Sequence, residues 1–281
     1  MIGFGKRRSH DAKAVVTGAG SGIGQAFAVE LAKRGGSIVC SDIDVAAAQR
    51  TVDTITDEGG KALALRCDVS CIDEVQSLAD QARGWFGAPP TFVVNNAGVG
   101  AGGTLVGETS LDDWKWTLGI NLWGVIHGCH VFAPILREAG YGGIVNVASA
   151  ASFGAAPRMA AYNVSKAGVL ALSETLAAEL SGTGVRVSVL CPTLVKTSIL
   201  ESGRITIGST DFASGLMNRI GMLPARVART TLDTHDRGGL YVMPQIDAKL
   251  GWRIKRFAPG VYTRGIGLIE RFGPDLDEQK G

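Results

Sequence analysis

Short apolar runs alternate with longer segments of helical periodicity along most of this chain. The runs that we expect as strands are 12–17, 37–41, 61–67, 91–95, 143–148, 185–190 and 240–243. The segments that we expect as helices are 25–34, 45–58, 71–86, 110–137, 158–181 and 224–236. Apolar strands separated by helices are typical of a parallel sheet with helices on both faces. The sequence therefore predicts an α/β fold built on a doubly wound parallel sheet.

The chain has the size and composition of one such domain. It has 281 residues, of which 46% are apolar, and no linker or composition break divides it. We expect the core over about 12–244, with a partly helical lid over 193–222, where glycine, serine and threonine mix with apolar residues. An apolar and basic extension follows over 245–281. We expect it to pack as a helix on the domain or on a neighbouring subunit, and favour this over peripheral contact with a membrane.

Charge and cysteine usage narrow the classes of function. A net charge of +2 is too small to indicate a nucleic-acid partner. The five cysteines have no Cys-x-x-Cys spacing, so we expect reduced thiols and a cytoplasmic location. We expect neither a signal peptide nor a transmembrane segment, because no sufficiently long apolar run is present. His127 and His130 lie close together without a carboxylate or cysteine partner, so we expect no metal site.

A glycine-rich turn separates the first expected strand from the first expected helix. Gly18, Gly22 and Gly24 permit a close backbone approach, and the helix N-terminus behind them suits a phosphate. Asp42 ends the second strand, 18 residues past Gly24. A carboxylate there accepts hydrogen bonds from a ribose diol and repels a 2′-phosphate. A helix cap is the alternative role, but Asp44 is the better cap candidate. The pattern therefore predicts NAD(H) as cofactor rather than NADP(H).

Tyr162 and Lys166 lie four apart in an expected helix and so share one face, while Ser149 follows an expected strand. A free tyrosine has a pKa of about 10 and is a poor base at neutral pH. A nearby ammonium favours the phenolate and lowers that pKa. Taken alone, the pair also fits an unremarkable surface face of a helix. The other motifs of the chain favour a catalytic role for Tyr162 and Lys166.

Five motifs occur in order over roughly residues 12–200: Thr17-Gly-Ala-Gly-Ser-Gly-Ile-Gly24, Asn95-Asn-Ala-Gly98, Asn121, Ser149 and Tyr162-x-x-x-Lys166. Their order and spacing resemble the classical short-chain dehydrogenase/reductase family. The resemblance implies a Rossmann-like domain with a seven-stranded parallel sheet. It also implies hydride transfer between a nicotinamide and an alcohol or carbonyl carbon.

The resemblance assigns roles to individual residues. Tyr162 is the expected general acid/base, and Lys166 is expected to hold the nicotinamide ribose and lower the tyrosine pKa. Ser149 is expected to bind the substrate oxygen, and Asn121 to support a relay water. The expected cofactor contacts are Gly18, Ser21, Gly22, Ile23, Gly24, Asp42, Ile43, Asp68, Val69, Asn95, Ala97, Gly98, Val147, Tyr162, Lys166, Pro192, Val195 and Thr197. Family members often form homodimers or homotetramers through the 110–137 and 158–181 helices, so we expect a homo-oligomer.

One departure from the family pattern affects the pocket. Thr193 stands where the family commonly has glycine, and we expect it to restrict that turn and point a side chain near the nicotinamide end. The residues that we expect to shape the pocket, with the lid, are Val99, Gly100, Ser152, Phe153 and Thr193. Their apolar bias favours a hydrophobic small-molecule alcohol or ketone. We therefore predict an NAD(H)-dependent oxidoreductase. The alternative is a non-catalytic NAD(H)-binding sensor, which would have no need of Tyr162.

Overall fold

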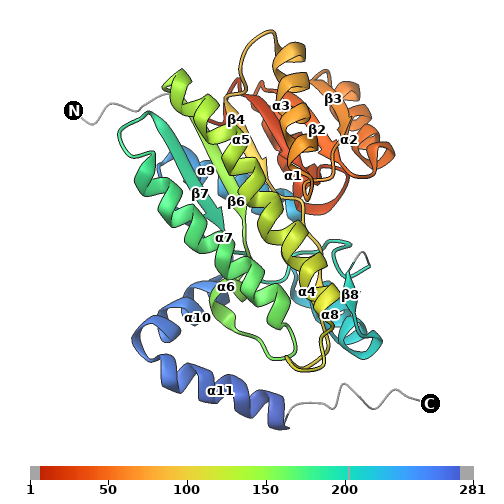
Figure 1. Cartoon of the computed structure of the whole chain (residues 1–281), viewed down its shortest axis with the longest axis vertical. Helices are drawn as coiled ribbons and strands as arrows, with labels where there is room; N and C mark the ends of the chain where they lie inside the picture. Colours follow the sequence, from red (N-terminus) through yellow and green to blue (C-terminus); the bar gives the residue numbers. More distant parts are fainter. Residues whose placement is uncertain (1–6, 202, 273–281) are drawn as a thin grey trace.

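A seven-stranded parallel sheet forms the centre of the molecule in the computed structural model, which describes residues 7–201 and 203–272 (Figure 1). Its strand order is β3-β2-β1-β4-β6-β7-β9, and every neighbouring pair is parallel. The strands are β1 (Lys13–Thr17), β2 (Ser37–Asp42), β3 (Lys61–Arg66), β4 (Phe92–Asn95), β6 (Gly142–Val147), β7 (Val185–Leu190) and β9 (Tyr241–Val242). The predicted fold is confirmed, and the observed strand bounds differ from the predicted ones by at most one residue.

Three helices cover each face of the sheet. On one face lie α1 (Gly22–Lys33), α2 (Val45–Asp57) and α9 (Pro224–Asp236), which pack Phe27, Val52 and Leu232 against the strands. On the other lie α3 (Ile72–Phe86), α5 (Gly124–Ala139) and α7 (Ala160–Glu179). The two separate hydrophobic clusters explain why the strands are apolar along their whole length.

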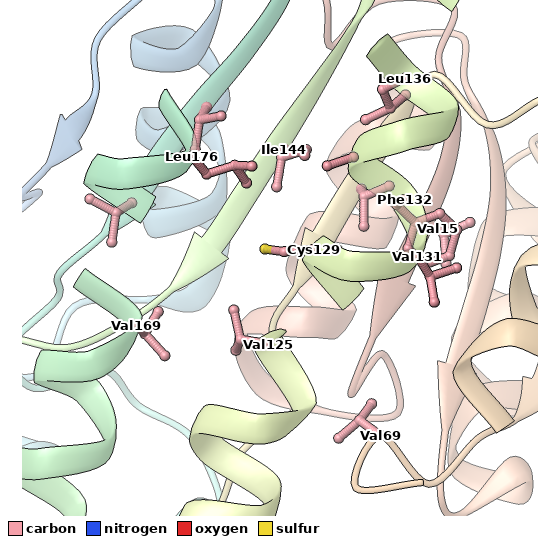
Figure 2. Close-up of a cluster of buried hydrophobic side chains, with 14 of the residues drawn as sticks. Val15, Val69, Val125, Cys129, Val131, Phe132, Leu136, Ile144, Val169 and Leu176 are labelled. Atoms are coloured by element: carbon pink, nitrogen blue, oxygen red, sulfur yellow. The ribbon is translucent and has the colours of Figure 1, made fainter. Parts of the chain in front are cut away.

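The core beneath α5 shows how the sequence periodicity produces this packing (Figure 2). Val125, Cys129, Phe132 and Leu136 recur at helical spacing and are all buried. Figure 2 shows them gathered with Ile144 of β6 and with side chains of α7. Burying a side chain as large as phenylalanine or leucine contributes about 1.5–3 kcal/mol, so this face fixes α5 on the sheet.

The order in which the chain adds strands to the sheet changes direction at β1. The chain moves from β1 outward to β2 and β3, then returns to pair β4 with β1 on its other side. In open α/β sheets, ligands bind outside the carboxyl ends of the strands at such a switch point. The segments that leave β1 and β4 here are the glycine turn at Gly18 and the stretch Asn96–Gly98.

The helix predicted over 110–137 is present but not uniform. It comprises α4 (Leu111–Leu118), a π-helical segment η1 (Gly119–Trp123) and α5, which continues past Pro134. Ser110 caps it, as predicted, by accepting from Asp113 N at 3.0 Å. By length and mean hydropathy (1.3), Leu111–Ala139 also meets the criteria for a membrane span, although 44% of its apolar window is buried inside the protein. The contacts of α5 with the sheet account for that burial.

The segment 193–222, for which a role as a lid was predicted, is partly helical, as expected. It contains β8 (Arg204–Ile205), which pairs with β5 (Ala101–Gly102), and α8 (Ile207–Ile220). A short helix, α6 (Ala151–Gly154), and a loop lie between Ser149 and α7. The sequence predicted that the helix would begin at 158, but the loop continues and α7 begins at Ala160. In this loop Ala155 and Arg158 have φ values of 50° and 58°. Both are left-handed conformations that residues other than glycine adopt at a cost, and they delay the start of α7.

The C-terminal extension packs on the domain, as predicted. It forms α10 (Ile246–Phe257) and α11 (Pro259–Phe272), which lie at the foot of the molecule in Figure 1. Ala248 of α10 is buried, and Trp252 packs against the main core. Tyr262 of α11 donates to the carbonyl of Gly154 at 3.0 Å. The end of the extension, 273–281, lies outside the described residues. Four of the five cysteines are buried and all five are free thiols, as expected.

Candidate active site

The glycine turn after β1 takes a shape that side chains would block. Gly18 and Gly22 have φ values of 63° and 55°, in the left-handed region that favours glycine. A Cβ on Gly18 would lie 2.8 Å from the Cα of Ala97, so glycine also permits the close approach of the β4 loop. The turn brings Gly18 and Ala97, two predicted cofactor contacts, against each other.

The N-terminus of α1 is open toward this turn. Ser21 occupies the N-cap and is exposed, yet its side chain makes no capping hydrogen bond, and the first turn holds no acidic residue. The N–H groups that open the helix, around Gly22 and Ile23, therefore suit an anion. The open helix end and the glycine backbone fit the diphosphate of a dinucleotide.

Asp42 lies beside the turn at the end of β2, where a ribose-binding carboxylate was predicted. Its Oδ2 accepts from Gly20 N at 2.9 Å, and its Oδ1 accepts from Asp44 N at 3.1 Å. A carboxylate accepts about four hydrogen bonds, so capacity remains for a diol. Asp44 caps α2 by accepting from Ala46 N and Ala47 N, as expected. Ile43, between the two acids, is 60% exposed.

Arg66 is a charged neighbour of Asp42 that the linear sequence does not reveal. The parallel register of β2 and β3 pairs Asp42 with Arg66. Arg66 Nη1 lies 2.7 Å from Glu74 Oε2, and the same oxygen accepts from Asp68 N at 2.8 Å. These two hydrogen bonds lower the pKa of Glu74. Glu74 therefore engages the cation that lies closest in register to the predicted ribose site.

Two predicted contacts after β3 are close to α5. Asp68 accepts from the backbone and hydroxyl of Ser70 at 2.9 and 2.7 Å. Val69 is buried, and its carbonyl lies 2.9 Å from Nδ1 of His127. A Cβ on Gly124 would lie 2.6 Å from the Val69 side chain, so glycine in α5 allows this loop to approach.

Asn95 and Asn96 have different environments at the end of β4. The structure places the side chain of Asn95, which was expected to line the cofactor groove, in the interior, donating to Asn146 Oδ1 at 2.8 Å. Asn96, not predicted as a site residue, donates to the carbonyls of Thr17 and Gly18 at 2.9 and 3.1 Å. It thus ties the β4 loop to the glycine turn. The repeated asparagine in the motif was the available signal for this role.

Gly98 brings Asn121 and Lys166 together. A Cβ on Gly98 would lie 3.0 Å from Asn121 Oδ1 and 3.4 Å from Lys166 Nζ. Asn121 is fully buried in the π-helical segment η1, a backbone form that is frequent at functional sites. Its side chain accepts from Val99 N at 2.8 Å and donates to Val99 O at 2.9 Å. In this arrangement the amide of Asn121 fixes the backbone of the β4 loop.

Ser149 and Tyr162 meet where β6 ends and α7 begins. Ser149 follows β6 and Tyr162 lies in the first turn of α7. Burial raises the pKa of Tyr162, and a hydrogen bond with Ser149 opposes this by lowering it. The net direction is opposite to the lowering that we expected from Lys166. The phenol of the chain by itself is therefore protonated at neutral pH.

Lys166 lies one turn further along α7. Its Nζ is 5.7 Å from the centre of the Tyr162 ring and donates to the carbonyl of Val147 at 3.0 Å. Burial lowers the pKa of Lys166 to about 8, with a small opposing effect of Cys191. The hydrogen bond to Val147 fixes the ammonium beneath the strand end, close to Gly98.

The segment after β7 returns to the glycine turn. The carbonyl of Pro192 accepts from Ala150 N at 2.8 Å, and Val195 forms a bridge with Met222. A Cβ on Gly22 would lie 3.0 Å from the methyl group of Thr197, so this segment reaches the N-terminus of α1. Thr197 therefore lies against the first residue of α1, while Val195 is paired with the segment that follows α8.

The side chain of Thr193 contacts α10, whereas we expected it near the nicotinamide end of the pocket. Its hydroxyl donates to Asp247 Oδ1 of α10 at 3.2 Å, so it connects the turn to the C-terminal extension. Its backbone is not in the left-handed region, so the turn does not require the family's glycine.

A cavity of about 380 Å³ lies beside the first turn of α7. Met159, Ala160 and Ala161, which precede Tyr162, form one wall, and Ala101 and Ile205 of the small second sheet form another. Arg158, Arg204 and Asp113 make part of its rim polar. The cavity is next to Tyr162 without being lined by Ser149 or Lys166.

Comparison with known proteins identifies the family. The family model for short chain dehydrogenases matches residues 12–206. This chain belongs to the short chain dehydrogenase family. Among solved structures, a short chain dehydrogenase/reductase from Burkholderia phymatum in complex with NAD superimposes with a TM-score of 0.85 at 35% identity, covering 90% of this chain and 96% of that one.

Curated relatives carry varied names. The probable oxidoreductase EphD of Mycobacterium tuberculosis is 39% identical over 197 residues, and the match covers 70% of this chain. This chain spans about a third of the length of that relative, of which 33% is covered. D-threitol dehydrogenase of Mycolicibacterium smegmatis is 40% identical, with 66% of this chain and 71% of that protein covered. Cyclohexanol dehydrogenase of an Acinetobacter species is 35% identical, with coverages of 66% and 74%.

Proposed function

We propose that this protein is an NAD(H)-dependent oxidoreductase that interconverts an alcohol and a ketone or aldehyde, with Tyr162 as general acid/base. The observation that carries the proposal is the meeting of Ser149, Tyr162 and Lys166 at the carboxyl edge of the sheet, the edge at which the open N-terminus of α1 also lies. The names of the cyclohexanol and D-threitol dehydrogenases support a reaction at a hydroxyl-bearing carbon. A non-catalytic sensor would need the dinucleotide groove but not this trio.

Different residues of the chain would have different roles in such a reaction. When bound, a nicotinamide supplies the acceptor for hydride in oxidation and the donor in reduction. The N-terminus of α1 would hold the diphosphate, and Asp42 would accept hydrogen bonds from the ribose diol. Ser149 orients the phenol of Tyr162 and the substrate oxygen. Tyr162 gives its proton to that oxygen in reduction and removes one in oxidation.

The electrostatics of the site favour the acid form of Tyr162. Because burial raises its pKa, the phenol is protonated at neutral pH, which is the form that carbonyl reduction requires. Lys166, with a pKa of about 8, keeps substantial positive charge under the same conditions. That charge lies 5.7 Å from the centre of the Tyr162 ring and stabilises the phenolate that forms on proton transfer.

The substrate that we propose is a hydrophobic small molecule. Val99 and its neighbours after β4 are apolar, and so are Met159 and Ile205 in the cavity wall beside α7. Threonine hydroxyls and the charged side chains of Arg158, Arg204 and Asp113 also line that cavity, so it offers hydrogen-bond partners to a substrate hydroxyl or carbonyl. A panel of apolar secondary alcohols and ketones, followed through NADH formation or loss, tests the assignment. NADH binding without turnover of any member would favour the sensor instead.

The decisive variant is Tyr162→Phe, which removes only the phenolic hydroxyl. General acid/base catalysis contributes roughly 10²–10⁴-fold, so turnover should fall by that factor while NADH binding, followed by fluorescence titration, is retained. Tyr141→Phe is the matched control, because Tyr141 precedes β6 at the opposite end of the sheet from Ser149. Undiminished turnover in Tyr162→Phe would contradict the assigned role.

A homo-oligomer is the assembly that we propose. Trp123 of η1 and Val164 of α7 are 53% and 49% exposed on the two helices that the family resemblance assigns to subunit contacts. Light scattering of the purified chain measures the mass that tests this proposal.

A further inference from the structure

The helix α10 carries a second apolar face that the domain does not cover. Its inner face holds Ala248 and Trp252, which pack on the protein. Its outer apolar residues are Ile246, Leu250, Ile254 and Phe257, with exposed fractions of 81%, 57%, 40% and 85%. Their spacing of four, four and three residues forms one stripe along the helix. The stripe is therefore an ordered feature of the helix surface.

The helix α11 repeats this arrangement. Tyr262 faces inward and donates to the carbonyl of Gly154. Val261, Leu268 and Phe272 lie seven and four residues apart on another face and are 70%, 56% and 74% exposed. In Figure 1 the two helices follow one another along the foot of the molecule. Two successive helices thus present outward apolar stripes.

Basic side chains accompany both stripes. The segment 246–272 holds six basic residues: Lys249, Arg253, Lys255, Arg256, Arg264 and Arg271. Its two acidic residues are engaged elsewhere: Asp247 accepts from Thr193, and Glu270 pairs with Arg158. The net charge of the whole chain is only +2, so this segment is a local concentration of positive charge.

We propose that the outward face of α10 and α11 binds the surface of a lipid bilayer that contains anionic phospholipids. Helices of this kind bury an apolar stripe at the boundary between headgroups and acyl chains, while basic residues lie against lipid phosphates. A second copy of the chain fits less well, because a symmetric contact through this face would bring the same basic patch of both copies together. The proposal is independent of the reaction catalysed.

Co-sedimentation of the full chain with vesicles tests the proposal. We expect binding to vesicles of phosphatidylcholine mixed with phosphatidylserine, little binding to phosphatidylcholine alone, and weakening by added salt. Phe257→Ser combined with Leu268→Ser and Phe272→Ser should lower partitioning at least tenfold. Arg253→Gln combined with Arg264→Gln and Arg271→Gln should remove the preference for phosphatidylserine.

Matched controls carry the same chemical changes elsewhere. Val106→Ser with Ile220→Ser changes residues that are 68% and 66% exposed outside the extension. Arg50→Gln, Arg83→Gln and Arg137→Gln remove three exposed charges from α2, α3 and α5. Both controls should bind vesicles as the parent does, and circular dichroism confirms folding of every variant. Absence of binding to anionic vesicles, or equal loss in variants and controls, would overturn the proposal. A change of oligomeric mass without vesicle binding would overturn it in favour of a second copy.

Discussion

At the scale of single residues, Asp42 makes structural hydrogen bonds at the position where a ribose-binding carboxylate was predicted. It accepts from Gly20 N in the glycine turn and from Asp44 N before α2, and its side chain remains partly exposed. Its register partner Arg66 is a cation that a 2′-phosphate would attract, but Glu74 lies 2.7 Å from it. We therefore propose that discrimination between NAD and NADP depends on two acids rather than one.

Cofactor preference should change stepwise when these acids are removed. We expect Asp42→Ala to weaken NAD binding and relax discrimination against NADP, because repulsion of the 2′-phosphate is lost. Adding Glu74→Gln should favour NADP further, since Arg66 is then free to pair with the phosphate. The measurement is kcat/KM for each cofactor. Asp80→Asn, an exposed change on α3, is the control. An unchanged preference in the double variant would rule out this account.

Much of the site was predictable from residue types, and the remainder depends on three-dimensional surroundings. The glycine turn and the caps at Asp44 and Ser110 follow from local rules, which apply to any chain. The proximity of Arg66 to Asp42 depends on strand register, and the direction of the Tyr162 pKa shift depends on burial. Neither register nor burial is a property of a short sequence motif.

At the scale of elements, the connection from Ser149 to α7 is the least regular part of the site. Ala155 and Arg158 adopt left-handed backbone conformations, which cost about 1–2 kcal/mol each for residues other than glycine. The π-helical turn around Asn121 and these two φ values were not predicted. A shift in helical hydrogen bonding leaves no compositional signal, and alanine and arginine are not residues that mark such turns.

The helix α11 holds this connection in place. Tyr262 donates to Gly154 O at 3.0 Å, and Glu270 Oε1 lies 2.7 Å from Arg158 Nε. Tyr262→Phe combined with Glu270→Gln should therefore raise KM for the alcohol several-fold, because the loop before Tyr162 is less well positioned, while NADH affinity is unchanged. Steady-state kinetics and NADH titration separate the two quantities. Glu58→Gln, which removes a surface pair with Lys33, is the control. A KM equal to that of the parent would show that α11 does not position the loop.

At the scale of the whole molecule, His235 links three strands to α9. Its Nδ1 lies 2.9 Å from the hydroxyl of Ser188 in β7, its ring contacts Phe92 of β4 edge-on, and a Cβ on Gly143 of β6 would lie 2.4 Å from its Nε2. The side chain is fully buried. Burial lowers its pKa to about 4, with Arg186 and Arg8 acting in the same direction and Asp236 opposing them. The folded protein therefore holds this imidazole neutral where the unfolded chain would protonate it.

This difference predicts acid sensitivity of the fold. Between about pH 6.5 and the folded pKa of about 4, the unfolded state binds more protons, so the free energy of unfolding falls as pH falls. At 1.36 kcal/mol per pH unit, the loss across that window is about 3 kcal/mol. Urea denaturation at several pH values measures it. His235→Gln cannot titrate and should flatten the dependence over this window, whereas His130→Gln, which replaces an exposed histidine on α5, should leave it unchanged. If the free energy of unfolding of His235→Gln depended on pH as steeply as that of the parent, the acid sensitivity would have to arise from the carboxylates. The neutral buried imidazole would then not account for the loss of stability.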